Sequence, residues 1–206
     1  MRFRWGDGEV RKALGLPAGS RGSDLTFRGV STDSRSVEAG DLFVALKGDN
    51  FDGHDFIARA LEQGATGVVA ERDVSGVGVQ LYRVDDTLVA LGHLAHHRGS
   101  ALRAKVVGIT GSSGKTTTKD LLTETLGGTL QVHGTQGNFN NRVGLPLTLL
   151  AAPDETEALV LEMGTNEPGE IRSLTAIAEP HIGVITTVSE THLEKLGSLE
   201  GVLEEK

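Results

Sequence analysis

A glycine-rich turn followed by Lys115 and Thr116 has the residue types and the spacing needed to bind the phosphates of a nucleotide. The turn, residues 110–114, directly follows the apolar run 106–109. In a phosphate-binding loop, the backbone N–H groups of the turn and the positive N-terminus of the next helix face the phosphates. The lysine reaches the terminal phosphates, and the threonine hydroxyl can bind Mg²⁺. This stretch therefore predicts a triphosphate site between a buried strand and a helix.

The turn departs from the general phosphate-loop pattern, in which a glycine and four further residues precede Gly-Lys-Ser/Thr. That pattern requires glycine at position 109, where this chain has Ile109. We therefore interpret the turn as a shortened variant that depends on Gly111 and Gly114. The alternative is an ordinary strand-to-helix turn whose glycines only supply positive φ angles.

Two further side chains with possible metal chemistry follow apolar runs that predict strands. Glu162 ends the run 158–161. A carboxylate at the end of a strand beside a phosphate loop lies where a Mg²⁺ ligand is needed, but it can also be a solvated acid. His192 follows the run 182–188 and is either a ligand or a loop histidine. Lys206, considered by itself, has the character of a surface lysine.

Two polar stretches are candidates for ligand contact. Residues 137–146 contain several amide side chains ahead of an apolar helical segment. Asparagines favour turns and helix caps, but these amides could also converge on a polyphosphate or a sugar. The asparagines are Asn138, Asn140 and Asn141. The second stretch is a dense polar turn in the first part of the chain, composed of Ser31, Thr32, Asp33, Ser34 and Arg35.

The composition limits the classes of protein that the chain can belong to. Its 206 residues can form one large or two small domains, and 38% hydrophobic with 23% charged residues is typical of a soluble globular protein. A net charge of −8 argues against nucleic-acid binding and against an anionic membrane surface. The absence of cysteine excludes disulfides and thiolate metal sites. No apolar run approaches the roughly 18 residues of a membrane span, so we expect a cytoplasmic protein without membrane insertion.

Short apolar runs alternate with helical patterns, which predicts an α/β fold. Strands are expected at residues 42–46, 67–70, 80–84, 105–110, 130–133, 158–163 and 182–188. Helices are expected at residues 55–63, 86–103, 115–126 and 168–178. We place a domain boundary between residues 99 and 104. The second part begins as a βαβ unit but has fewer strands than a mononucleotide-binding domain needs, so we expect the chain to be the N-terminal portion of a longer protein.

Taken together, these stretches resemble the Mur ligases of bacterial cell-wall synthesis, and within that family most closely the MurF type. Residues 29–35, 40–46 and 52–56 are similar to the N-terminal substrate-binding domain that the MurE and MurF types share. Residues 110–117 resemble the family's own shortened ATP loop, which accounts for Ile109. Glu162-Met163-Gly164, residues 168–171 and residues 192–194 follow in the family's order, and residues 137–150 favour MurF over MurE.

The resemblance implies a fold and a set of site residues. Residues 1–100 would form a small α/β domain that binds the UDP-sugar peptide, and residues 104–206 the first part of a parallel-sheet P-loop ATPase domain that is truncated here. The residues implied to bind the ATP phosphates are Gly111, Ser112, Ser113, Gly114, Lys115, Thr116 and Thr117. Thr116 and Glu162 would bind one Mg²⁺, and His192 a second metal ion. Lys206 falls where the family carries a carbamylated lysine; an ammonium would repel Mg²⁺, whereas a carbamate supplies the oxygen ligands that this ion prefers.

The implied activity is ATP-dependent addition of D-Ala-D-Ala to UDP-MurNAc-tripeptide through an acyl phosphate. Lys115, His192 and Lys206 would act in catalysis, and residues 31–35 would face the uridine nucleotide. We expect a monomer. We also expect that a polypeptide of this length, isolated from the rest of the protein, has no ligase activity. The alternatives are another ligase of the superfamily, of the MurE or folylpolyglutamate synthase kind, and a non-catalytic substrate-binding fragment. A generic P-loop NTPase is a third alternative, which the polar turn at residues 31–35 argues against.

Overall fold

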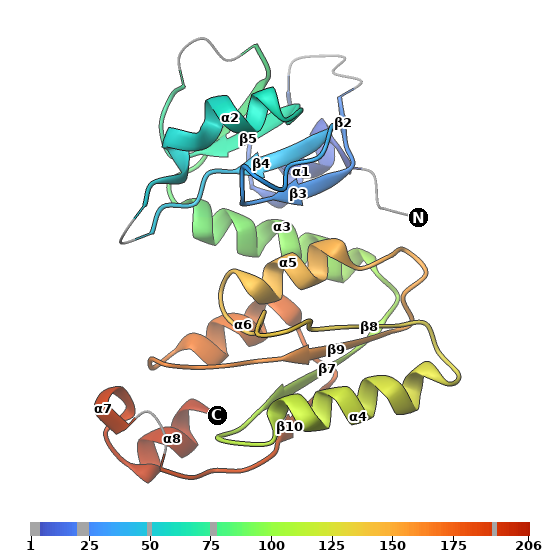
Figure 1. Ribbon diagram of the computed structural model, residues 1–206, viewed down its shortest axis with the longest axis vertical. Helices are drawn as coiled ribbons and strands as arrows, with labels where there is room; N and C mark the ends of the chain where they lie inside the picture. Colours follow the sequence, from blue (N-terminus) through green and yellow to red (C-terminus); the bar gives the residue numbers. More distant parts are fainter. Residues whose placement is uncertain (1–4, 20–24, 49–50, 75–77, 191–192) are drawn as a thin grey trace. The chain divides into compact units, whose positions relative to one another are not determined.

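The computed structural model describes residues 5–19, 25–48, 51–74, 78–190 and 193–206 (Figure 1). The chain forms two compact units, residues 1–97 and residues 98–206. Each unit contains a four-stranded sheet in which all neighbouring strands are parallel. The predicted α/β architecture is therefore confirmed. In the described part of the chain, no helix has both the length and the apolar character that crossing a bilayer requires.

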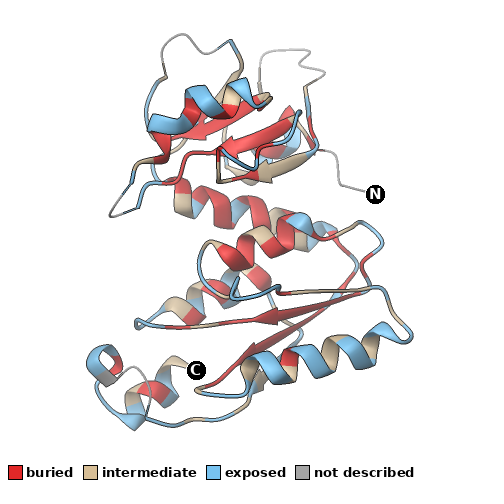
Figure 2. Ribbon diagram, in the orientation of Figure 1, coloured by how far each residue is buried: buried red, intermediate tan, exposed pale blue. Residues whose placement is uncertain are grey.

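The sheet of the first unit has the strand order β3-β4-β5-β6. Its elements are β3 (Gly29–Ser31), β4 (Asp41–Val44), η1 (Gly53–Phe56), α2 (Ile57–Glu62), β5 (Gly67–Ala70), β6 (Gln80–Arg83) and α3 (Thr87–Ala101). The two central strands, β4 and β5, are buried along their whole length (Figure 2). Their almost continuous apolar sequences are typical of inner strands in parallel sheets. The apolar side of α2 covers them through Ile57 and Ala60, which pack with Phe43 and Val68.

A small N-terminal substructure was not predicted from the sequence. It consists of β1 (Trp5–Gly6), α1 (Asp7–Ala13) and β2 (Thr26–Phe27), with β1 and β2 antiparallel. Buried Tyr82 of β6 donates a hydrogen bond to Asp7 Oδ1 at 2.7 Å, and Arg11 Nε donates to Asp7 Oδ2 at 2.9 Å. Burial and the Asp7 carboxylate raise the pKa of Tyr82, so its hydroxyl remains a donor. These bonds attach α1 to the sheet.

We expect Asp7→Ala to lower the free energy of unfolding by about 2–3 kcal/mol, because it leaves the buried Tyr82 hydroxyl without this acceptor. Urea unfolding followed by the fluorescence of Trp5, the single tryptophan, measures this change in the first unit. The matched control is Asp73→Ala, because Asp73 pairs with Arg83 at 3.4 Å while its side chain is 80% exposed. An exposed pair of this kind contributes about 0–1 kcal/mol. Equal losses in the two variants would contradict the structural role of Asp7.

The sheet of the second unit has the strand order β10-β7-β9-β8. Its strands are β7 (Lys105–Thr110), β8 (Val132–Gly134), β9 (Ala158–Glu162) and β10 (Ile182–Ile185). Its helices are α4 (Lys115–Gly127), α5 (Gly144–Ala151), α6 (Glu170–Ala178), α7 (Leu193–Leu196) and α8 (Leu199–Glu205). Figure 1 shows α4 on one face of the sheet and α5 with α6 on the other. Val107, Ile109 and Val160 form the core beneath α4.

The expected strands and helices are present, with shifts at their ends that have identifiable causes. Strand β10 ends at Ile185, not at residue 188, because the next residues bond to the turn after β7. Helix α6 begins at Glu170, not at residue 168, because its N-cap, Gly169, has a φ of 86°. The short elements β1, α1, β2, β3 and α7 were not predicted, since two to seven residues give too little periodicity to identify.

Candidate nucleotide and metal site

The candidate site lies where the carboxyl ends of β7, β9 and β10 meet. In an open parallel sheet, ligands bind beyond these ends, at the point where successive strands are added on opposite sides. Here β9 and β10 flank β7 on its two sides, so this point lies at the end of β7. The turn that we call the phosphate loop, residues 110–114, begins at the last residue of β7 and leads into α4.

The phosphate loop needs glycine at Gly111 and benefits from it at Gly114. Their φ angles are 145° and 79°, in the range that favours glycine. At Gly111 an added Cβ would lie only 2.0 Å from Thr186 Oγ1. The shortened loop therefore depends on close approach between the loop backbone and the segment after β10. Lys115, the first residue of α4, donates from Nζ to the Gly111 carbonyl at 2.7 Å, which holds its ammonium over the loop.

Residues 186–189, which we call the bracing segment, hold the phosphate loop through a series of hydrogen bonds. The Ser112 amide donates to the Thr187 carbonyl at 2.9 Å, and the Ser113 amide donates to Thr187 Oγ1 at 3.0 Å. Thr186 Oγ1 donates to the Ser113 carbonyl at 2.6 Å, and the Ser189 amide donates to Ser112 Oγ at 3.0 Å. The loop conformation is thus fixed by residues more than 70 positions away in the sequence.

Glu162, at the end of β9, is buried and lies against α4. Its side chain accepts a hydrogen bond from Thr116 Oγ1 at 2.9 Å and one from Asn140 Nδ2 at 2.8 Å. Its backbone N–H donates to Thr135 Oγ1 at 2.9 Å. Thr116 and Glu162 are 46 residues apart in the sequence, and the fold brings their oxygens together beside the phosphate loop.

This pair of oxygen ligands fits Mg²⁺ better than it fits a metal held by protein groups alone. Mg²⁺ in nucleotide sites is bound by one or two protein oxygens together with phosphates and water. Among the described residues, no cluster of three or more His, Cys, Asp or Glu side chains could hold a metal ion. The hydroxyl of Thr116 and the carboxylate of Glu162 therefore suit a cation that arrives with a nucleotide.

The asparagine-rich stretch divides into residues with different surroundings. Asn141 Oδ1 accepts from the Val143 and Gly144 amides at 3.1 and 2.8 Å, so it serves as a cap at the start of α5. Asn140 bonds to Glu162, and Asn138 is exposed. The contacts of Asn141 agree with the turn-and-cap interpretation, and its binding of a ligand stays a prediction.

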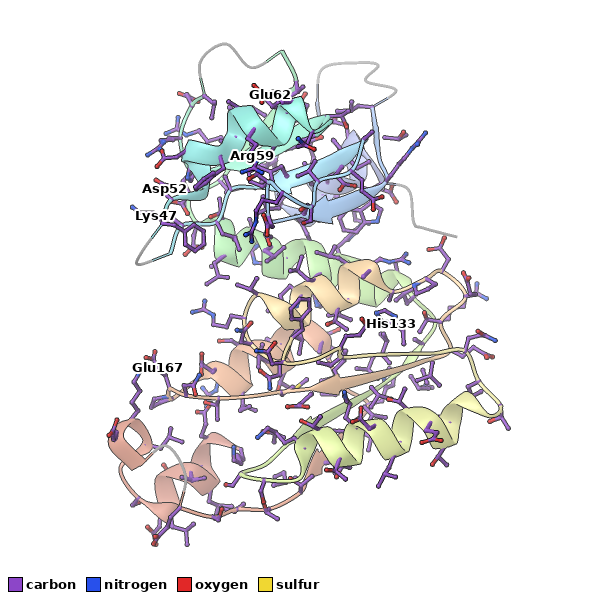
Figure 3. The ribbon with its side chains drawn as sticks, viewed as in Figure 1. Lys47, Asp52, Arg59, Glu62, His133 and Glu167 are labelled. Carbon is purple, nitrogen blue, oxygen red and sulfur yellow. The ribbon has the colours of Figure 1, made fainter. Side chains whose placement is uncertain are left out.

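Lys206 follows α8 and lies near Lys115, and hydrogen bonds accepted by the preceding residue, Glu205, fix α8 against the start of α6. Burial and the nearby Lys115 lower the pKa of Lys206, while Glu205 opposes this shift. The Glu205 carboxylate accepts hydrogen bonds from the Gly169 and Ile171 amides at 2.6 and 2.8 Å, at the positive N-terminus of α6. Glu167, which precedes α6 and is labelled in Figure 3, accepts a hydrogen bond from Lys195 of α7. His192, the expected second metal ligand, lies outside the described residues.

The polar turn of the first unit follows β3. Ser31 is the last residue of β3, and Thr32, Asp33, Ser34 and Arg35 follow it in the turn. Arg35 donates to both Asp33 oxygens, with Nη2 to Oδ2 at 2.6 Å. This hydrogen bonding lowers the pKa of Asp33 to about 2, and Arg59 of α2, labelled in Figure 3, adds a small effect in the same direction. The turn therefore presents an exposed guanidinium and a partly exposed carboxylate beside the buried Ser31 and Ser34.

Sequence reasoning missed two buried polar groups, of which the first supports Glu162 of the candidate site and the second lies elsewhere in the first unit. In the second unit, buried Lys119 donates from Nζ to the Thr135 carbonyl at 3.0 Å, and Thr135 in turn supports Glu162. Lys119 lies one helical turn after Lys115, and this spacing was the available signal. In the first unit, buried His54 lies 2.5 Å from Asp52 Oδ1 through Nδ1 and accepts from the Glu71 amide at Nε2.

Two family models match the chain. Residues 26–99 match the model described as Mur ligase family, catalytic domain, and residues 109–206 match the Mur ligase middle domain. A curated protein of Bacillus subtilis (strain 168), UDP-N-acetylmuramoyl-tripeptide--D-alanyl-D-alanine ligase, is 46% identical over 194 residues, which are 93% of this chain and 42% of that protein.

Two crystal structures are also similar. MurF from Acinetobacter baumannii is 33% identical with a TM-score of 0.91, covering 99% of this chain and 45% of that one. MurF ligase from Thermotoga maritima in complex with ADP is 41% identical with a TM-score of 0.81, covering 89% of this chain and 43% of that one. The chain thus spans less than half the length of these relatives.

Proposed function

Because the chain belongs to the Mur ligase family, we propose that it forms part of an ATP-dependent ligase that adds D-Ala-D-Ala to a UDP-N-acetylmuramoyl-tripeptide. The observation that carries this proposal is the contact of Thr116 with Glu162 beside the phosphate loop, in a chain 46% identical to a ligase of that name. In this proposal residues 1–100 bind the UDP-sugar peptide through the turn at residues 31–35, and residues 104–206 bind ATP.

The proposed reaction has two steps. The terminal carboxylate of the tripeptide attacks the γ-phosphorus of ATP, which forms an acyl phosphate and releases ADP. The D-Ala-D-Ala amine then attacks the acyl carbon and loses a proton, and the tetrahedral intermediate expels phosphate as the amide forms. Activation is required because a free carboxylate would have to expel oxide, a very poor leaving group.

The residues of the second unit would act mainly by placing charge. Lys115 would exchange the Gly111 carbonyl for phosphate oxygens and offset the repulsion between the carboxylate and the triphosphate. Thr116 and Glu162 would hold Mg²⁺, which when bound supplies further positive charge to the phosphates. The N–H groups at the start of α4 would face the same oxygens.

The proposal is tested by assaying the protein at its full natural length for phosphate release with ATP, UDP-MurNAc-tripeptide and a range of amine acceptors. We expect phosphate release and a UDP-MurNAc-pentapeptide product with D-Ala-D-Ala as the acceptor and with no other amine. Reaction with meso-diaminopimelate or lysine would instead assign the protein to the amino-acid-adding ligases. The absence of nucleotide-dependent release with every acceptor would contradict a ligase function altogether.

We further propose that Lys206 is carbamylated in the active protein. A lowered pKa gives more of the neutral amine near neutral pH, and only the neutral amine attacks CO₂, which yields a carbamate and a proton. Removing CO₂ should lower the activity, and added bicarbonate should restore it. The recovery should be slower at lower pH because more of the Lys206 amine is then protonated. Mass spectrometry at neutral pH should find the added carboxyl group. A fully active protein with an unmodified lysine would contradict this proposal.

A further inference from the structure

We propose that Asn140 is a positioning residue that fixes the Glu162 carboxylate for metal binding, and does not itself contact the substrate. This inference rests on the proposed Mg²⁺-dependent binding of ATP. It concerns the asparagine-rich stretch, whose role the sequence left open. The geometry around Glu162 carries it.

The two carboxylate oxygens of Glu162 have separate partners. Oε1 accepts from Asn140 Nδ2 at 2.8 Å, and Oε2 accepts from Thr116 Oγ1 at 2.9 Å. Glu162 is only 3% exposed, so water cannot stabilise its charge and these two donors must do so. Since Thr116 is the expected partner of Glu162 in binding Mg²⁺, Oε2 is the oxygen on the metal side. Asn140 then holds the other oxygen and with it the orientation of the carboxylate plane.

Asn140 is itself held in place, as a positioning residue must be. Its backbone carbonyl accepts from the Gly164 amide at 2.8 Å, two residues beyond Glu162. The carboxamide lies against Gly164, where an added Cβ would be 3.0 Å from Asn140 Cγ. On the other side, an added Cβ at Gly144 would lie 2.4 Å from Phe139 Cα, so the loop is seated closely on the start of α5. The amide therefore has little freedom to turn toward a ligand.

A neutral N–H donor is the chemical group that this position requires. A lysine or arginine next to Oε1 would neutralise the carboxylate and repel Mg²⁺. An aspartate would repel Glu162 and compete for the cation. The carboxamide donates to Oε1 without a net charge and leaves the full charge of Glu162 available to the metal. Groups that orient a metal ligand in this way commonly contribute 10-fold to 100-fold to metal affinity.

The test is a double-mutant cycle on the protein at its full natural length. A non-hydrolysable ATP analogue is titrated at a series of Mg²⁺ concentrations against the parent, Asn140→Leu, Glu162→Gln and the double variant. Gln136→Ala is the matched control, because Gln136 is an exposed carboxamide four residues earlier in the same segment. Thermal unfolding is measured for each variant, and Asn140→Ser replaces Asn140→Leu if the latter unfolds at the assay temperature.

We expect Asn140→Leu to raise the Mg²⁺ concentration for half-maximal binding about 10-fold or more, with metal-free nucleotide affinity unchanged. In the Glu162→Gln background the same substitution should add less than about twofold, because Asn140 acts through Glu162. An equal shift in both backgrounds, or no shift in the parent background, would overturn the inference and leave the ligase proposal intact. A parent protein whose nucleotide binding ignores Mg²⁺ would overturn both.

Discussion

Replacing Lys115 with alanine is expected to lower kcat of the ligase reaction by about 10³-fold or more. Among the described residues, Lys115 has the single ammonium that is bonded to the phosphate loop, at 2.7 Å from the Gly111 carbonyl, and the substitution removes it. The charge is needed most when the peptide carboxylate approaches the triphosphate, because several anionic oxygens then lie close together. Affinity for the UDP-sugar peptide should change by less than about twofold, since the proposed sugar site is in the other unit.

The matched control for this prediction is Lys105→Ala. Lys105 begins the strand that ends at the phosphate loop, but it lies at the opposite end and is exposed. Its replacement should leave kcat within about twofold of the parent value. Steady-state phosphate release gives kcat, and calorimetry with the UDP-sugar peptide gives the affinity. If Lys115→Ala weakened both to a similar extent, the assignment of Lys115 to the phosphates would be wrong.

Gly111→Ala is expected to lower kcat about 100-fold, although it adds only one methyl group. The new Cβ would lie 2.0 Å from Thr186 Oγ1, at a φ angle of 145° that alanine rarely adopts. Either the phosphate loop or the bracing segment must move, and a displacement of about 1 Å at a reacting group has an effect of this size. Nucleotide affinity should fall with kcat because the loop itself is distorted.

Gly127→Ala is the control for this change. Gly127 ends α4, and an added Cβ there would meet no atom within 4 Å. Alanine in a helix restricts the unfolded chain, so this variant should be neutral or more stable by about 0.5–1 kcal/mol. Comparing kcat and the unfolding midpoint for the two variants separates damage to the loop from a general cost of substitution. Normal turnover in Gly111→Ala would contradict the close approach described here.

The parts of the fold that the sequence predicted well are those specified by local pattern. Strand β7 begins and ends where expected because apolar residues stop at the glycine turn, and α4 begins at Lys115 for the same reason. Residues 55–63 were expected to be one helix, whereas the first turn is the 3₁₀ helix η1, capped by Asp52 through the His54 amide. That distinction depends on one side-chain bond, which periodicity does not reveal.

The support around the candidate site could not be predicted because it joins distant positions. The bonds between Ser113 and Thr187 span 74 residues, and the bond between Asn140 and Glu162 spans 22. Threonines and asparagines in these stretches carry no pattern that distinguishes a support from a ligand contact. For Asn141 the fold favours a cap, because Gly144, three residues later, begins α5. Only the three-dimensional arrangement makes these assignments.

The hydrogen bonds between the bracing segment and the phosphate loop have a thermodynamic consequence. The Ser112 and Ser113 amides donate to Thr187, which orders the loop backbone before any nucleotide arrives but leaves these two N–H groups engaged with protein and not with the phosphates predicted from the sequence. Ordering a flexible loop on binding would cost conformational entropy, and a preorganised loop avoids most of that cost. Nucleotide binding should therefore carry little unfavourable conformational entropy from the loop backbone.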